Sequence, residues 1–197
     1  MNVVVKFGFD KLKQFEKKLK KLIYNIDRKI LIGSIEVEKD FAQIQGDYHR
    51  ISVYSDELLI SIFDYLKHPN LVVDIFNGVN RYLSIKQQLI GFQFTDFVFF
   101  DRDIWEPIDF ISQFNQNFFK ESVGSNLERY HIVLGCRPIN GADDTKYFIS
   151  CEEEDGNHLY FSGQYEFETS DIGKVKDHAM LSKEFLRIFN SFQETYY

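Results

Sequence analysis

The stretch that most constrains the fold is residues 145–168, where apolar residues recur at every second position on both sides of a turn. The apolar positions are Tyr147, Ile149 and Cys151 before the turn and Leu159, Phe161, Tyr165 and Phe167 after it. A period of two places alternate side chains on opposite faces of a strand, so each arm is expected to bury one face. The sequence therefore predicts a β-hairpin in an antiparallel sheet.

The loop of this hairpin must have an odd number of residues. If Asp155 and Gly156 alone formed the turn, odd-numbered residues would face even-numbered ones, and the two apolar stripes would lie on opposite faces. A three-residue loop from Asp155 to Asn157 places both stripes on one face, and Gly or Asn supplies the left-handed residue that the loop needs. We therefore predict three cross-strand pairs: Cys151 with Phe161, Ile149 with Gly163, and Tyr147 with Tyr165.

Hydrophobic spacing divides the rest of the chain into short strands and helices. Strands are expected at residues 3–9, 30–37, 48–54, 92–100 and 130–136, and the last is nearly all apolar, as a central strand would be. Helices are expected after a cap at Asp10, after a cap at Ser55 that the acidic Asp56 and Glu57 follow, over 71–90 with Gly91 at its end, from Glu106 to 118, and after a cap at Ser182. No internal repeat or domain linker is visible. The predicted fold is a single α+β domain spanning residues 1–197, with an antiparallel or mixed β-sheet covered by four to five helices and a C-terminal β-hairpin followed by a helix.

Composition favours a cytoplasmic protein. Aromatic residues make up 17% of the 197 residues, which suits a well-filled core, and no apolar run has the length of a membrane span. The first residues lack the charged and apolar regions of a signal peptide. Cys136 and Cys151 are the only two cysteines, and without an export signal they are expected to be reduced, packed thiols. We expect no cofactor.

Charge is distributed unevenly along the chain. Residues 1–29 contain nine Lys and Arg against three Asp and Glu, a net charge of +6, whereas residues 30–197 contain fourteen against twenty-seven, a net charge of −13. The acidic body should repel nucleic-acid phosphates and attract basic partners. The lysine-rich first helix is compatible with a membrane or nucleic-acid surface, but Glu16 and Asp27 interrupt its charge, and docking on the acidic body is the simpler interpretation. We therefore expect neither nucleic acid nor membrane as a partner.

The acidic hairpin tip is the predicted binding site. Glu152, Glu153, Glu154 and Asp155 are four adjacent carboxylates, and they could attract a protein with a basic surface. His158 and Tyr160 are expected on the polar face beside them. A tip that is merely solvated, and that discourages sheet edges from pairing, is the alternative. Small acidic inhibitors of basic toxins, such as bacterial immunity proteins, illustrate the role by analogy of charge and size. The predicted function is that of a non-catalytic protein-binding protein.

Two pairs of aspartates leave a second hypothesis open. Asp101 and Asp103 follow an apolar strand, and Asp143 and Asp144 lie in a loop near another strand end. Carboxylates in such positions can hold Mg²⁺ for phosphoryl or glycosyl transfer or hydrolysis. However, no phosphate-binding glycine-rich loop accompanies them, and solvated turn residues are the simpler interpretation. The five histidines show no helical metal-ligand spacing.

Overall fold

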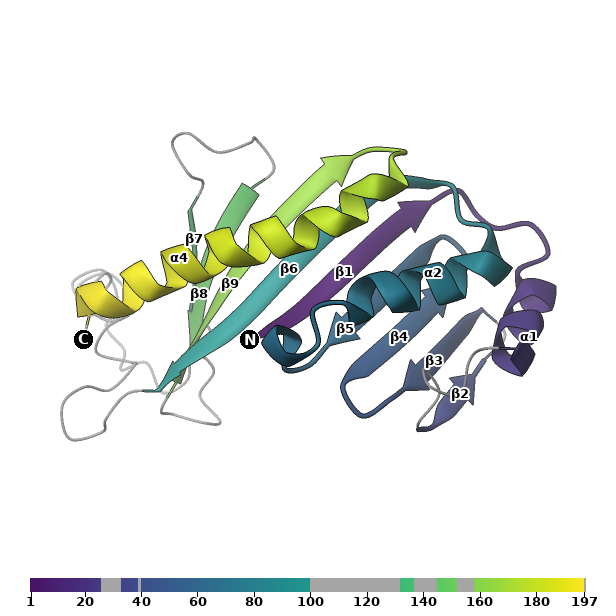
Figure 1. Ribbon diagram of the computed structural model, residues 1–197, viewed down its shortest axis with the longest axis horizontal. Helices are drawn as coiled ribbons and strands as arrows, with labels where there is room; N and C mark the ends of the chain where they lie inside the picture. Colours follow the sequence, from purple (N-terminus) through teal and green to yellow (C-terminus); the bar gives the residue numbers. More distant parts are fainter. Residues whose placement is uncertain (26–32, 39, 100–131, 137–144, 152–157, 197) are drawn as a thin grey trace, which may run out of the picture.

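The described strands form one antiparallel sheet. The computed structural model describes residues 1–25, 33–38, 40–99, 132–136, 145–151 and 158–196. Nine strands are hydrogen-bonded in the order β2-β3-β4-β5-β1-β6-β9-β8-β7, and every pairing is antiparallel (Figure 1). The predicted α+β class and the C-terminal hairpin followed by a helix are therefore confirmed.

The chain runs through two stretches of similar order. The first contains β1 (Asn2–Phe9), α1 (Phe15–Asn25), β2 (Ile35–Val37), β3 (Phe41–Gln45), β4 (His49–Tyr54), β5 (Glu57–Ile62), the 3-10 helix η1 (Tyr65–Lys67) and α2 (Leu71–Leu83). The second contains β6 (Gln87–Phe99), β7 (Ile132–Cys136), β8 (Thr145–Cys151), β9 (His158–Glu168), the 3-10 helix η3 (Ile172–Asp177) and α4 (His178–Tyr196).

Four strands and the last helix of each stretch repeat one topology. The sheet order β1-β5-β4-β3 on one side of its centre matches β6-β9-β8-β7 on the other, and each stretch ends in a helix. The buried residues of the two helices have the same spacing: Val72, Ile75, Phe76, Val79 and Leu83 in α2, and His178, Leu181, Ser182, Phe185 and Phe189 in α4. The repeat is not visible in the sequence because the equivalent positions carry different residues.

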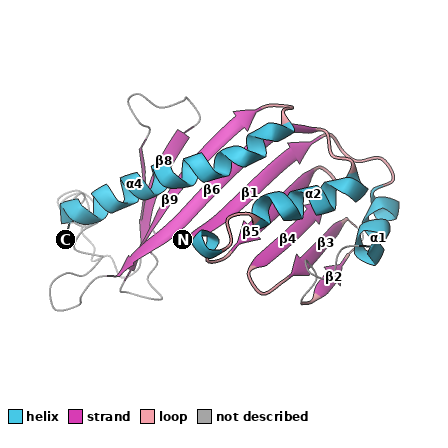
Figure 2. Ribbon diagram, in the orientation of Figure 1, coloured by secondary structure: helices cyan, strands magenta, loops and turns pink. Residues whose placement is uncertain are grey.

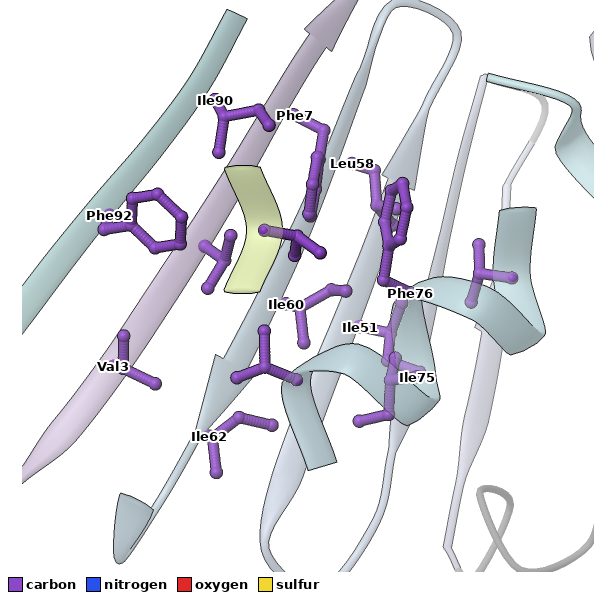
Figure 3. Packing of buried hydrophobic residues seen from close by; sticks show 14 of the residues in the cluster. Val3, Phe7, Ile51, Leu58, Ile60, Ile62, Ile75, Phe76, Ile90 and Phe92 are labelled. Atoms are coloured by element: carbon purple, nitrogen blue, oxygen red, sulfur yellow. The ribbon is translucent and has the colours of Figure 1, made fainter. Parts of the chain in front are cut away.

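Helices cover one face of the sheet (Figure 2). Alternation selects that face: in β1 the buried residues are Val3, Val5, Phe7 and Phe9. The ring of Phe7 stacks on Phe76 of α2 with centroids 4.3 Å apart, and Figure 3 shows the two rings among the side chains of β5 and β6. Burial of these side chains provides most of the stabilisation, about 1.5–3 kcal/mol for each large apolar residue.

The prediction of four to five helices is wrong for the described residues, which contain three α-helices: α1, α2 and α4. The helix expected after Ser55 is the strand β5, whose buried residues Leu58, Ile60 and Ile62 alternate. It is hydrogen-bonded to β1 on one side and β4 on the other, and this double ladder outweighs the local helix-start signal. The helix expected from Glu106 to 118 lies outside the described residues.

Several predicted boundaries also move. The helix α2 ends at Leu83 with Ser84 left-handed, and Gly91 lies inside β6 rather than at a helix end. Ser182 is an internal residue of α4, where its hydroxyl donates to the carbonyl of Ala179 at 3.0 Å. The apolar strand near residue 132 is β7, which lies at the edge of the described sheet and not at its centre. The strand β3 was missed.

The hairpin has the predicted parity but a different register. Cys151 pairs with Leu159, and Ile149 pairs with Phe161. Tyr147 pairs with Gly163, so all three predicted partners are two residues too far along β9. A shift of two residues keeps every side chain on its own face, so the hydrophobic pattern does not distinguish the two registers.

Candidate functional site

Most of the predicted site residues lie outside the described part of the chain. This holds for the acidic tip, Glu152, Glu153, Glu154 and Asp155, and for the four aspartates of the metal hypothesis, Asp101, Asp103, Asp143 and Asp144. Two residues of the predicted binding site are placed on β9. His158 is its first residue and pairs with Phe99, and the partly buried Tyr160 pairs with Phe97 and Ser150.

Tyr160 belongs to the face of the sheet that the helices leave uncovered, which we call the open face. In β9 the buried Phe161 and Tyr165 point to the helices, so Ser162, Gln164 and Glu166 occupy the other side. Cross-strand pairing extends this polar side to Gln93 and Gly91 in β6 and to Lys6 in β1. The prediction that His158 and Tyr160 contribute to binding stays a prediction.

A hollow of about 310 Å³ lies on the open face at the centre of the sheet. Its side chains come from five strands: Val4 and Lys6 of β1, Glu57 and Leu59 of β5, Gln93 of β6, Lys146 of β8, and Gln164 and Glu166 of β9. Gly91 lies in its lining between Lys6 on one strand and Glu166 on the other. A methyl group on Gly91 would contact the Cγ of Glu166 at 3.4 Å and the Cβ of Lys6 at 3.6 Å, so the missing side chain deepens the hollow.

The hollow contains one ion pair, in which Lys6 and Glu57 neutralise each other's charge. The Nζ of Lys6 lies 2.7 Å from the Oε2 of Glu57, and the two side chains are 45% and 28% exposed. The hydrogen bond to Glu57 raises the pKa of Lys6 despite partial desolvation, and the charges of Glu57, Glu166 and Asp56 act in the same direction. Lys6 therefore stays protonated at neutral pH, and its charge is compensated by Glu57.

Within the described part of the chain, the other polar side chains of the hollow have no partner. No hydrogen bond or ion pair with another described residue occupies Gln93, Lys146 or Gln164, and Glu166 acts on Lys6 only at longer range. The hollow thus presents one carboxylate, one ammonium group and two amides, beside the apolar side chains of Val4 and Leu59. These groups suit binding by hydrogen bonds and charge.

Sequence reasoning missed these residues for a specific reason. It assigned Glu57 to a helix start and Gly91 to a helix end, which removed both from the sheet. The alternation of Ser162, Gln164 and Glu166 in β9 was the one local signal that marked a polar face. Nothing local indicated that β1, β6 and β9 are neighbours.

Metal ligation and membrane crossing by a helix find no support among the described residues. Among them, no group of three or more His, Cys, Asp or Glu side chains could hold a metal ion. No helix in the described ranges is long and apolar enough to cross a membrane. Comparison of the chain with models of protein families and with curated proteins gives no match.

Proposed function

We propose that this is a non-catalytic, cytoplasmic protein-binding protein that recognises a basic surface on another protein, as an acidic immunity protein inhibits a basic toxin. The observation that supports this proposal best is the paired hairpin. Because β8 ends at Cys151 and β9 begins at His158, the four acidic residues 152–155 belong to the segment that joins two hydrogen-bonded strands. β9 is hydrogen-bonded to β6 on one side and to β8 on the other, so the sheet provides a scaffold for a contact segment.

Charge is the second line of support. A net charge of −13 over residues 30–197 produces a field that attracts a cationic protein from a distance. Such steering raises association rates by roughly 10- to 1000-fold and weakens as salt screens the charges. A partner recognised in this way should therefore bind faster and more tightly at low ionic strength.

The proposal is tested by charge reversal at the tip. Wild type and a variant with Glu152, Glu153, Glu154 and Asp155 all changed to Lys are used to capture partners from the native host. A matched control changes Glu36, Glu38, Asp40 and Asp47 to Lys, which alters the net charge equally at exposed positions near the opposite edge of the sheet.

We expect the tip variant to lose a captured protein at low salt, the control to retain it with only slightly reduced affinity, and added salt to release it from wild type. Association rates of the purified pair then separate steering from contact. If both variants lost the captured protein equally, overall charge and not the tip would explain the binding. Unchanged capture by the tip variant would refute the proposed contact.

A further inference from the structure

The hollow on the open face has the properties of a small-molecule site. It combines a concave surface, two apolar side chains and several polar groups aimed into one volume, and it lies where the two topologically equivalent stretches of the chain meet, between β1 and β6. Ligand sites favour concave places of this kind at the junctions of structural units. This inference is independent of the proposed protein contact at the hairpin tip.

From the charges that line the hollow, we propose that it binds a small zwitterion of the free α-amino acid class. Lys6 and Glu57 neutralise each other at 2.7 Å, which leaves Glu166 and Lys146 as the two charges of the hollow that no other described residue pairs. A ligand with a single charge would meet one favourable and one unfavourable group. A zwitterion satisfies both, with its ammonium group at Glu166 and its carboxylate at Lys146.

The size of the hollow limits the ligand. A volume of about 310 Å³ lies at the lower end of the roughly 300–1,000 Å³ that small-molecule pockets occupy. That volume accommodates a free amino acid. The amide groups of Gln93 and Gln164 can orient the polar end of the ligand, and Val4 and Leu59 offer a surface to its side chain.

Gly91 carries the strongest indication that the space is used. Glycine in the middle of a strand weakens the strand, because it has no side chain to pack and loses the most backbone entropy on folding. Packing does not demand glycine here, since a Cβ atom would make ordinary contacts at 3.4 Å and beyond. A larger side chain would, however, occupy the hollow.

The site is tested by calorimetric titration of the full chain with individual free amino acids. Acetate and ethylammonium serve as single-charge probes of the two halves of the ligand. We expect at least one amino acid to bind with a Kd on the order of 1 mM or lower, and both single-charge probes to bind at least tenfold more weakly.

Three variants and two controls locate the binding. Gly91→Val should weaken binding at least tenfold by filling the hollow, whereas Gly8→Val, a glycine on the same face of β1 outside the lining, should not. Glu166→Gln and Lys146→Gln should each weaken binding about 2- to 5-fold, the range expected for one exposed charge contact. Glu168→Gln, the next open-face position on β9, should leave it unchanged.

Chemical denaturation of each variant shows whether it is folded, so that lost binding is distinguished from lost structure. If no free amino acid binds, or if Gly91→Val binds as tightly as wild type, the assignment is refuted. The tip variant described above should bind the amino acid as wild type does. Failure of the protein contact therefore leaves this inference standing, and the reverse is also true.

Discussion

A buried polar contact between the two topologically equivalent stretches should control stability. Tyr65, from η1 of the first stretch, is 1% exposed, and its hydroxyl hydrogen-bonds to Nδ1 of His178 at the start of α4. His178 and Ser182 occupy the positions in α4 that Val72 and Phe76 occupy in α2. Polar residues thus replace apolar ones at two core positions, and Tyr65 contacts both of them.

Removing the hydroxyl with Tyr65→Phe should lower the free energy of unfolding by about 1–3 kcal/mol, because Nδ1 of His178 would remain buried without its partner. His178→Leu together with Tyr65→Phe should cost less than the sum of the two single changes, since the double variant leaves neither group unsatisfied. Tyr82→Phe is the matched control. Its hydroxyl donates to the carbonyl of Asn25 in an exposed bond of 3.2 Å, and its loss should change stability little.

The same contact predicts a dependence on pH. Burial lowers the pKa of His178 below its ordinary value of 6.5. Between the folded and unfolded pKa values, the unfolded chain binds more protons than the folded protein, so the free energy of unfolding rises with pH. The contribution of neutral His178 is therefore complete above about pH 6.5 and is lost as the pH falls toward the folded pKa, with a slope of at most about 1.4 kcal/mol per pH unit.

Urea denaturation followed by circular dichroism, at several pH values from about 5 to 7.5, measures both effects. The difference between wild type and His178→Leu isolates this histidine from the carboxylates, which titrate in both proteins. A difference that does not change with pH would refute the account of the buried neutral imidazole. A cost of Tyr65→Phe no larger than that of Tyr82→Phe would refute the account of the hydrogen bond.

Two further predictions concern the helix α2 and the residue that follows it. Ser84 follows α2 with a φ of 53° and a ψ of 54°, so Ser84→Gly should stabilise the protein by up to about 1 kcal/mol in urea denaturation, whereas Asn77→Gly, on the exposed side of α2, should destabilise it by a similar amount. Stabilisation by both changes, or by neither, would contradict this reading of the helix end. Phe76→Ala should lower the free energy of unfolding by about 3–5 kcal/mol, because it removes a fully buried ring stacked on Phe7; a cost below 1 kcal/mol would mean that the core collapses around the change.

The strands that could be predicted from the sequence are those whose alternation is unambiguous. In residues 145–168 the period of two identified both arms and, in β9, the face that buries Phe161 and Tyr165. It did not determine the register, since pairing Cys151 with Leu159 instead of Phe161 leaves every face unchanged. Register depends on the conformation of the connecting segment and on β6, which pairs with the full length of β9, and neither is visible in a local pattern.

The segment after Ser55 shows why local signals can fail. Leu59, Ile62 and Phe63 have helical spacing, while Leu58, Ile60 and Ile62 alternate as in a strand, so the same residues satisfy both periods. The acidic residues after Ser55 favoured the helix. The segment forms a strand because β1, which is distant in the chain, and β4, which is the strand just before it, each provide it with a complete hydrogen-bonded ladder.

The hollow could not be predicted from the sequence because it also depends on which strands become neighbours in the sheet. Lys6, Gly91 and Glu166 form a line across β1, β6 and β9, and each is individually an ordinary open-face residue of its strand. Their neighbourhood exists only because the two stretches of the chain join through β1 and β6, the first strand of each. Joining two such stretches also places a glycine between a paired lysine and an open carboxylate. The proposed binding chemistry is therefore a property of that junction, and substitutions at Gly91 should affect it more than equal changes at open-face positions outside the hollow.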